Sequence, residues 1–565
     1  MLNKILSLQY LSSLMTKKAL ISPICQLMVI PTTLLLGALP AVAGSIGLPL
    51  PTITELAKDA WIYGFAPVTV AEKEFNQTIP TADAVYAPIN KLFIDTATPL
   101  PDNQLWVSPN VNVVYASSHI DLTNQPLILF NPDRSTTPFA DQYFVWQFMD
   151  AYTNDYDYVG SRTTGQGEGT YAIVGPNFNG TIPFPITKTI TSPTNSGWIV
   201  GRFEVTPNST SDRNEVVNLI QKNVFLTLNE YQSFIIDGND PDYKNPIITK
   251  PGIEFPELNV EGLEFFNVLN RWLVKNPPPA LDNPILGQIA QIGISPVESE
   301  QIEFDDQFII NNLDEAAALL LGIKEAEEIA AIKTIEPDQA YCVGSDVSFD
   351  NCSEDQKLLI NDVHNGWFYS LGTPFGNFED EYLPRTLLAR GGLGGNVVEE
   401  AVYPVRFFDE NDQLLSPTKQ YTFTFEAGFD PVNDPGFWSI TMYDLETGEI
   451  VANPLDRYTI GSQNDLIPNQ DGSITIYIQR DNPGGDQTNN WLPTAVSGND
   501  PFYLLFRAYN PKEGFYTPVS LIQDTEIPLP NIQTEPVPEP LTLLGTTTAI
   551  IFGASFKQRL NRKNK

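Results

Sequence analysis

The fold of this chain is decided by residues 436–511, which contain GFWSITMYD (436–444), NPLDRYTIG (453–461), DGSITIYIQ (471–479), NNWLPT (489–494) and PFYLLFRAYNP (501–511). In three of these pieces apolar and polar residues alternate, as they do in half-buried strands. Ile474, Ile476 and Ile478 fall on one face of their run, and Tyr477 falls on the other. The pattern predicts an antiparallel sheet with one apolar face and one polar, aromatic face.

The polar face of this predicted sheet collects aromatic and basic side chains. Its members are Tyr443, Tyr477, Tyr503, Arg507 and Tyr509, with Arg457, Tyr458 and Trp491 in nearby loops. Aromatic planes combined with directional donors are typical of carbohydrate or carboxylate recognition. The same pattern fits a face on which the arginine snorkels and the tyrosines cover a solvent-exposed surface. The sequence leaves both interpretations open.

The words FWSITMYD, NP-x-x-RY-x-IG, DGSITIYIQ and NWLP, in this order, resemble a bacterial two-domain family, the domains of unknown function 1254 and 1214. They match its C-terminal half, and PNVNVVY (109–115), DAYTND (150–155) and GSRTTG (160–165) match its N-terminal half. The resemblance implies a β-sandwich, jelly-roll-like domain and no established activity. Family members usually carry Asp where this chain has Asn112 and Arg where it has Gln142, so chemistry done by those two side chains elsewhere is absent here.

Length and charge restrict the class of protein. The 565 residues suffice for two or three domains, and 32 basic against 68 acidic residues give a net charge of −36. Such a surface repels phosphate backbones, so no nucleic-acid partner is expected. The excess fits a well-solvated exterior or, as the alternative, divalent cations. Calcium is the one cofactor that the sequence leaves open, because Asp-rich loops occur at residues 237–242, 409–412 and 430–434. None of these loops has the EF-hand pattern.

Both ends of the chain carry targeting features. Residues 1–43 read as a secretory signal, because an apolar run follows Lys17-Lys18 and ends in an A-x-A site with cleavage predicted after Ala43. At the other end, Pro538, Glu539 and Pro540 precede an uncharged segment (541–556) and a basic tail. This arrangement resembles the PEP-CTERM sorting signal. It implies export, processing by an exosortase-like enzyme, and a hydrophobic segment that holds the protein in the membrane at least transiently.

Two cysteines remain after the predicted signal. In an oxidising envelope, Cys342 and Cys352 are predicted to form one disulfide, and two free thiols are the alternative.

The predicted fold class is mainly β with a helical insert, in two β-sandwich or jelly-roll-like domains. Helical periodicity is expected over residues 54–70, 216–228, 263–274, 285–292, 311–333 and 353–371. The predicted division is a signal (1–43), an N-terminal β-rich domain (44–210), a helical insert (211–371), a C-terminal β-sandwich (372–526), a linker (527–536) and the sorting signal (537–565).

Familiar catalytic motifs are missing from the sequence: it has no G-x-S-x-G elbow, no Walker loop and no HExxH. Its two histidines, His119 and His364, are expected to be packed or surface residues rather than metal ligands, and no metal site is predicted.

Two hypotheses for function follow. The first is an exported envelope protein that binds a glycan or other small ligand in a groove between the two sandwiches, with Arg162 and Arg202 as further binding candidates. The second is a secreted hydrolase of glycans or lipids acting through carboxylates such as Asp150 or Asp471. An Asp150–Arg162 structural ion pair is the simpler alternative for that part of the chain.

Overall fold

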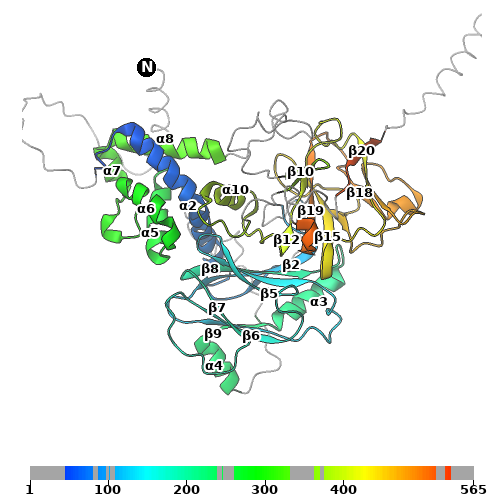
Figure 1. The fold of residues 1–565 in the computed structure, drawn as a ribbon, viewed down its shortest axis with the longest axis horizontal. Helices are drawn as coiled ribbons and strands as arrows, with labels where there is room; N and C mark the ends of the chain where they lie inside the picture. The colour runs from blue at the N-terminus through cyan, green and yellow to red at the C-terminus, as the bar shows by residue number, and fades with distance from the viewer. Residues whose placement is uncertain are drawn as a thin grey trace, which may run out of the picture.

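The computed structural model describes residues 45–79, 87–96, 101, 108–237, 245, 260–330, 362–369, 375–516 and 529–535, which form a helical part and two β units (Figure 1). The predicted signal, Cys342 and Cys352, and the predicted sorting signal lie outside the described residues. Among the described helices, none combines the length and the hydrophobicity that a membrane crossing requires.

The first β unit is a sandwich of two sheets. A five-stranded sheet has the order β1-β2-β8-β4-β5, and a four-stranded sheet has the order β7-β6-β3-β9. Their bounds are β1 Phe93–Ile94, β2 Val113–Asp121, β3 Leu127–Asn131, β4 Phe144–Asp150, β5 Asp155–Gly160, β6 Gly169–Val174, β7 Lys188–Thr191, β8 Ser196–Glu204 and β9 Val224–Thr227. Alternate residues such as Trp146, Leu129 and Ile173 fill the space between the sheets. Gly201 leaves room for Trp146 on the next strand, because a Cβ there would lie 2.6 Å from the indole ring.

The second β unit is also a sandwich. One sheet has the order β10-β11-β13-β19-β15-β16 with β12 beside β19, and the other has the order β18-β17-β14-β20. Their bounds are β10 Asp362–His364, β11 Trp367–Tyr369, β12 Ala401–Val402, β13 Val405–Arg406, β14 Gln420–Phe425, β15 Val432–Asp444, β16 Thr459–Gly461, β17 Ile474–Gln479, β18 Trp491–Pro493, β19 Phe502–Pro511 and β20 Ile532–Glu535. Its core joins Trp438 and Phe506 of one sheet to Ile476 and Ile478 of the other.

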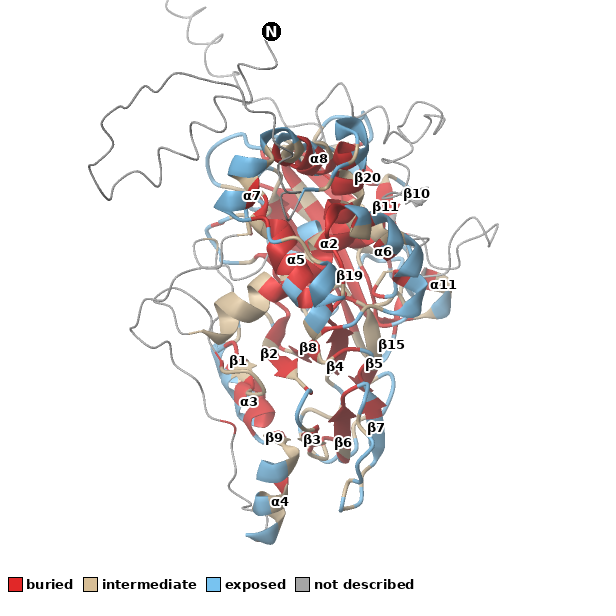
Figure 2. Ribbon diagram, turned by 90° about the vertical axis from the view of Figure 1, so that its left-hand side faces the viewer, coloured by how far each residue is buried: buried red, intermediate tan, exposed pale blue. Residues whose placement is uncertain are grey.

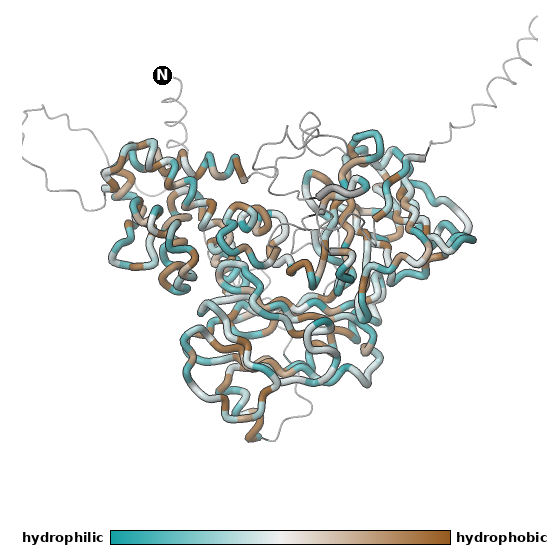
Figure 3. Tube along the Cα trace, in the orientation of Figure 1, coloured by the Kyte–Doolittle hydropathy of each residue, from teal (hydrophilic) through white to brown (hydrophobic). Residues whose placement is uncertain are grey.

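The helical part packs α2 against helices that come much later in the chain. Its members are α2 Leu50–Thr78, α5 Glu264–Lys275, α6 Asn283–Ile289, α7 Asp306–Asn311, α8 Leu313–Ala330 and α10 Tyr382–Gly392. Ile53, Ala60 and Trp61 of α2 share one core with α5 and α8. Hydrophobic residues recur along these helices and along the strands of both β units (Figure 3). In the first β unit, α3 Thr210–Gln221 and α4 Leu228–Ile236 flank β9.

The predicted class, a mainly β protein with a helical region, is confirmed, but two predicted helices include residues that form strands. The expected helix at 216–228 ends at Gln221, because the next residues pair with β3 as strand β9. Within the expected helix at 353–371, residues 362–369 form the hairpin β10-β11, and β11 pairs with β13. At both places the chain pairs with a strand that is distant in sequence, and this pairing outweighs the local preference for a helix. The predicted helical insert, 211–371, therefore contains β9, β10 and β11, which belong to sheets of the two β units.

The strands at the junction of the two β units are buried on both faces (Figure 2). Every residue of β4 is buried, as is every residue of β8 except Glu204 and every residue of β19 except Tyr503. One face of each strand packs inside its own sandwich, so the other face must be covered by a different part of the protein. This second covered face contains the candidate site.

Candidate functional site

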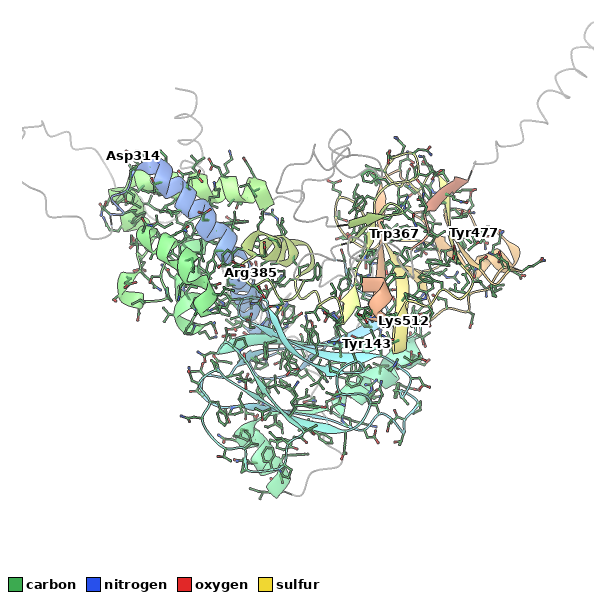
Figure 4. The ribbon with its side chains drawn as sticks, in the orientation of Figure 1. Tyr143, Asp314, Trp367, Arg385, Tyr477 and Lys512 are labelled. Atoms are coloured by element: carbon green, nitrogen blue, oxygen red, sulfur yellow. The ribbon has the colours of Figure 1, made fainter. Side chains whose placement is uncertain are left out.

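The polar face of β15 and β19 does not face solvent but packs against the first β unit. Tyr443, Arg507 and Tyr509 are only 0%, 4% and 1% exposed. Opposite them, β2 presents Tyr115 and β8 presents Arg202, and both arginines lie close enough to Tyr115 and Tyr509 to interact with them electrostatically. We call these five residues the inter-domain layer. Figure 4 labels Tyr143 at this junction.

Sheet pairing corrects one expected member of this face. Tyr477 lies on β17, which belongs to the other sheet of the second β unit, so Tyr477 points away from the layer. Its hydroxyl accepts a hydrogen bond from Gln487 Nε2 at 3.0 Å. Alternation places residues on the faces of one strand but does not say which strands share a sheet.

A short segment of the first β unit, residues 108–110, is held by the layer. Arg507 Nη2 donates to the Ser108 carbonyl at 2.6 Å, and the Tyr443 hydroxyl donates to the Pro109 carbonyl at 2.8 Å. Asn110 Nδ2 donates to the Tyr509 hydroxyl at 3.2 Å. The second β unit thus binds the first through directional hydrogen bonds as well as through apolar contact.

Arg202 connects β8 to the loop that follows α10. Its Nη1 donates to Gln147 Oε1 at 2.7 Å and to Asn396 Oδ1 at 3.2 Å, and its Nη2 donates to the Gly394 carbonyl at 2.6 Å. These acceptors are all formally neutral. The guanidinium is therefore hydrogen-bonded without a direct carboxylate partner.

Asp155 lies at the acidic end of the same network. Gln147 Nε2 donates to its Oδ1 at 2.7 Å, and the Tyr158 hydroxyl donates to its Oδ2 at 2.6 Å. Burial raises the pKa of Asp155 to about 8, so this carboxyl group holds its proton near neutral pH. Because Gln147 also bonds Arg202, its amide separates the carboxyl group from the guanidinium.

Glu400 is the second carboxyl group near the layer, and it is fully buried. It accepts hydrogen bonds from the Tyr143 hydroxyl and from Arg162 Nε, both at 2.6 Å, and burial raises its pKa. The alternative that paired Arg162 with Asp150 is therefore wrong, since the partner of Arg162 comes from the second β unit. A single sequence gives no signal for a contact across 238 residues.

One nitrogen of the Arg507 guanidinium group lacks a hydrogen-bond partner among the described residues. This nitrogen, Nη1, is buried, and the ring of Tyr443 lies 5.5 Å from the guanidinium carbon. Within the same described ranges, neither Arg202 nor Arg507 hydrogen-bonds a carboxylate. Guanidinium and phenol donors gathered in this way suit an acceptor-rich group such as a carboxylate.

The two carboxylates proposed for catalysis each close a local turn. Asp150 is buried at the end of β4, where its Oδ1 accepts from the backbone N–H of Tyr152 (2.8 Å) and of Asn154 (2.9 Å). Burial raises the pKa of Asp150 to about 6. Asp471 is exposed, and hydrogen bonds from Ser473 lower its pKa. The two residues lie in different β units, so the structure does not bring them together as a pair.

Three of the other ligand candidates belong to one corner of the second β unit. The Trp491 indole is buried and donates to the Gln479 carbonyl at 2.8 Å, and the Tyr458 hydroxyl donates to Asp456 at 2.8 Å. Arg457 Nη1 donates to the carbonyls of Thr488 (2.8 Å) and Trp491 (2.9 Å). These contacts give Arg457 a role in holding the loop before β18.

Arg457→Gln is accordingly expected to lower the free energy of unfolding by about 1–2 kcal/mol, because two carbonyl groups lose a charged donor. Urea denaturation measures the loss. Arg271→Gln is the matched control, since that side chain is 61% exposed and pairs with Glu264 at the surface, and it should cost under about 1 kcal/mol. Equal costs for the two variants would contradict the assigned role of Arg457.

His119 is a packed residue outside the layer. Its ring stacks on Trp198 with centroids 5.3 Å apart, and its Nε2 lies 2.8 Å from Gln77 Oε1. Burial, with the charges of Lys275 and Lys73, lowers the pKa of His119 to about 3. In the described ranges, no group of three or more His, Cys, Asp and Glu residues is placed as a metal ion would need.

Asn112 also contributes to the junction of the β units. It is 1% exposed, donates to Gln463 and accepts from the Thr459 hydroxyl at 3.1 Å. The family that this chain resembles usually has Asp at this position. Here the Asn112 amide makes polar contacts across the junction of the β units.

Sequence reasoning missed much of the network, in particular Tyr115, Tyr143, Gln147, Asp155 and Glu400. One signal was available, because Gln147 is a lone amide within the apolar run FVWQFM of residues 144–149. A polar residue at a fully buried strand position needs a hydrogen-bond partner and therefore marks a polar network.

An open groove lies apart from this network, between α2 and α5. Its volume is about 400 Å³, and its lining includes Phe75, Val268 and Trp272 with the charged residues Glu74 and Lys275. The two charged groups pair with each other at 2.8 Å. The groove belongs to the helical part and not to the junction of the β units.

A solved structure shares this architecture. The VPA0106 protein of Vibrio parahaemolyticus, whose structure is solved, is 20% identical, with a TM-score of 0.55 over 86% of this chain and 100% of that one. A solved structure from Burkholderia cenocepacia covers 86% of this chain and 94% of its own at 10% identity and a TM-score of 0.36. A search of curated proteins finds no match.

Two family models match the chain, and both are described as proteins of unknown function. The first, DUF1254, matches residues 89–227, and the second, DUF1214, matches residues 400–513. The first range covers strands β1 to β9, and the second contains β15 and β19, the two strands of the second β unit that contribute to the layer. The DUF1254 model therefore matches the first β unit and the DUF1214 model matches the second, and the inter-domain layer lies where the two units meet.

Proposed function

We propose that this chain is an exported cell-envelope protein that binds a glycan or another small polar ligand between its two β units. The observation that carries the proposal is the inter-domain layer, in which tyrosines and arginines of both units meet away from bulk solvent. An interface with a purely structural role is stabilised most simply by apolar side chains, since buried polar groups contribute only when they are fully hydrogen-bonded. Arg507 Nη1 departs from that requirement.

The cellular address in this proposal comes from the two ends of the sequence. A signal ending at Ala43 would direct export. The Pro538-Glu539-Pro540 segment with its basic tail would be recognised and processed by an exosortase-like enzyme. An envelope glycan is the kind of partner available at that address.

A hydrolase remains the second candidate, and Asp155 is the observation that favours it. Its carboxyl group is protonated near neutral pH and contacts the Tyr158 hydroxyl, which suits a general acid. The residue that would carry this reaction is therefore Asp155 rather than Asp150 or Asp471.

A thermal-shift screen of the purified protein against glycans and lipids, with and without a chelator, tests the binding function. We expect at least one polar ligand to raise the melting temperature by several degrees, with the same shift in EDTA. Tyr509→Phe should reduce that shift because it removes a hydroxyl from the layer. Tyr477→Phe is the matched control and should leave the shift unchanged, because Tyr477 lies on the other sheet.

Equal ligand responses in the two tyrosine variants would contradict a site in the layer. Product release from any glycan or lipid of the screen, abolished by Asp155→Asn, would favour the hydrolase instead.

A further inference from the structure

We infer that the ligand of the inter-domain layer carries a carboxylate, with Arg202 on the opposite side of the layer. Arg507 would bind it through Nη1, which has no hydrogen-bond partner among the described residues. This inference rests on the proposed binding function and specifies the chemical class of the ligand.

Charges around the layer do not balance. Three guanidinium groups, those of Arg162, Arg202 and Arg507, face two carboxyl groups, Asp155 and Glu400. Glu400 is bonded directly to Arg162, and Asp155 reaches Arg202 only through Gln147. Arg507 is left with neutral partners among the described residues.

Because Arg507 is buried, an uncompensated charge on it destabilises the folded protein. Arg507 is 4% exposed, so it has lost nearly all of its hydration. A buried charge normally has an opposite charge beside it, because the desolvation penalty is several kcal/mol per ion. The backbone carbonyl of Ser108 and the ring face of Tyr443 supply partial negative charge only. Asp155 holds its own proton near neutral pH and does not compensate Arg507, so a carboxylate ligand would supply negative charge where the described residues supply none.

The donors near Arg507 define the geometry of recognition. Nη2 is committed to the Ser108 carbonyl, which leaves Nη1 for the ligand. The hydroxyls of Tyr115 and Tyr509 lie within the electrostatic reach of Arg507 and of Arg202. A carboxylate has two oxygens with about four acceptor sites, so it can accept from a guanidinium and from phenols together. An uncharged sugar hydroxyl would satisfy the N–H group but leave the charge uncompensated.

Matched pairs of small molecules test the charge requirement. The probes are acetate against acetamide, benzoate against benzamide and D-glucuronate against D-glucose, added to the purified protein at constant ionic strength, with inorganic phosphate as a separate arm. We expect a carboxylate to raise the melting temperature while its neutral counterpart does not.

Equal shifts from both members of every pair would overturn the carboxylate while leaving the binding function in place. A shift from phosphate without one from any carboxylate would also overturn it. No shift from any probe or from the wider ligand screen would overturn the binding function as well.

Substitution of Arg507 provides the second test. In Arg507→Met the carboxylate affinity should fall at least tenfold, and the ligand-free melting temperature should change little, because removal of the charge offsets the lost hydrogen bond to the Ser108 carbonyl. Arg457→Gln is the control, and it should melt earlier but keep the carboxylate response. If Arg507→Met melts earlier than the parent and keeps the carboxylate response, Arg507 is only a structural residue and the inference is wrong.

Discussion

Arg385→Met is expected to lower the free energy of unfolding by about 3–5 kcal/mol, the largest effect of any single substitution proposed for this protein. Arg385 lies on α10 and is 1% exposed (Figure 4). Its guanidinium carbon lies 5.0–5.9 Å from the ring centroids of Tyr63, Tyr152 and Tyr382. Its Nη2 also donates to the Tyr63 carbonyl at 2.8 Å.

The physical reason is a buried carboxylate that would lose its cation. Asp282 accepts hydrogen bonds from the hydroxyls of Tyr63 and Tyr382, both at 3.0 Å, and the charge of Arg385 opposes the burial that raises the pKa of Asp282. Methionine fills a similar volume but supplies neither the charge nor the cation–π contacts, which contribute about 2 kcal/mol when desolvated.

Urea denaturation, with hydrogen exchange over α2 and α10, measures this loss. Arg390→Met is the matched control, since Arg390 lies on the same helix but is exposed, and it should cost under about 1 kcal/mol. If the two variants unfold at the same urea concentration, Arg385 does not hold α10 to the helical part as its contacts indicate.

Asp155→Asn should change how stability depends on pH. The pKa of Asp155 is about 8 in the folded protein and about 3.9 in an unfolded chain. A carboxyl group with a raised folded pKa stabilises the fold below its unfolded pKa, and this contribution is lost as the pH rises towards the folded pKa. Asparagine mimics the protonated carboxyl group and does not ionise. Between pH 5 and pH 8 the parent should therefore lose about 2–4 kcal/mol relative to the variant, a range reduced because Asp155 is half-buried.

Urea denaturation of both proteins at pH 5, 6.5 and 8 gives the difference directly. Asp157→Asn on the same strand is the control, because Asp157 forms an ion pair with the half-exposed Lys188 at 2.6 Å and should cost under about 1 kcal/mol. Parallel pH profiles for the parent and Asp155→Asn would show that Asp155 ionises freely in the folded protein. The general-acid candidate would then lose its support.

The Arg385, Asp155 and Arg507 variants separate three ways in which an ionisable group is accommodated in this protein. Arg385 has a carboxylate of the protein nearby, so its removal should destabilise the fold. Asp155 is neutralised by its own proton, so its contribution should depend on pH. Arg507 lacks either form of compensation among the described residues, so its removal should affect ligand binding more than stability.

The alternation of apolar and polar residues is enough to show which residues share a face of each strand in the second β unit. Trp438, Ile440 and Met442 all lie in its core, as the alternation from residue 437 onward predicts. The same holds for Phe502, Leu504 and Phe506. This inference is secure because the period of two is a local property of an extended chain. The motifs that resemble the family are short contiguous stretches, so they too can be read from the sequence without knowledge of the fold.

What the polar face contacts depends on the packing of the two β units and cannot be deduced from one strand. Alternation is identical whether Arg507 faces solvent, a ligand or another domain, and its observed partner, Ser108, lies 399 residues away. The partner of Arg162 is equally remote, at Glu400. The sheet to which a strand belongs also depends on partners elsewhere in the chain, since β17 pairs with β14 and not with β15 or β19. These contacts depend on how separate units pack in space, and no periodicity within a strand encodes that packing.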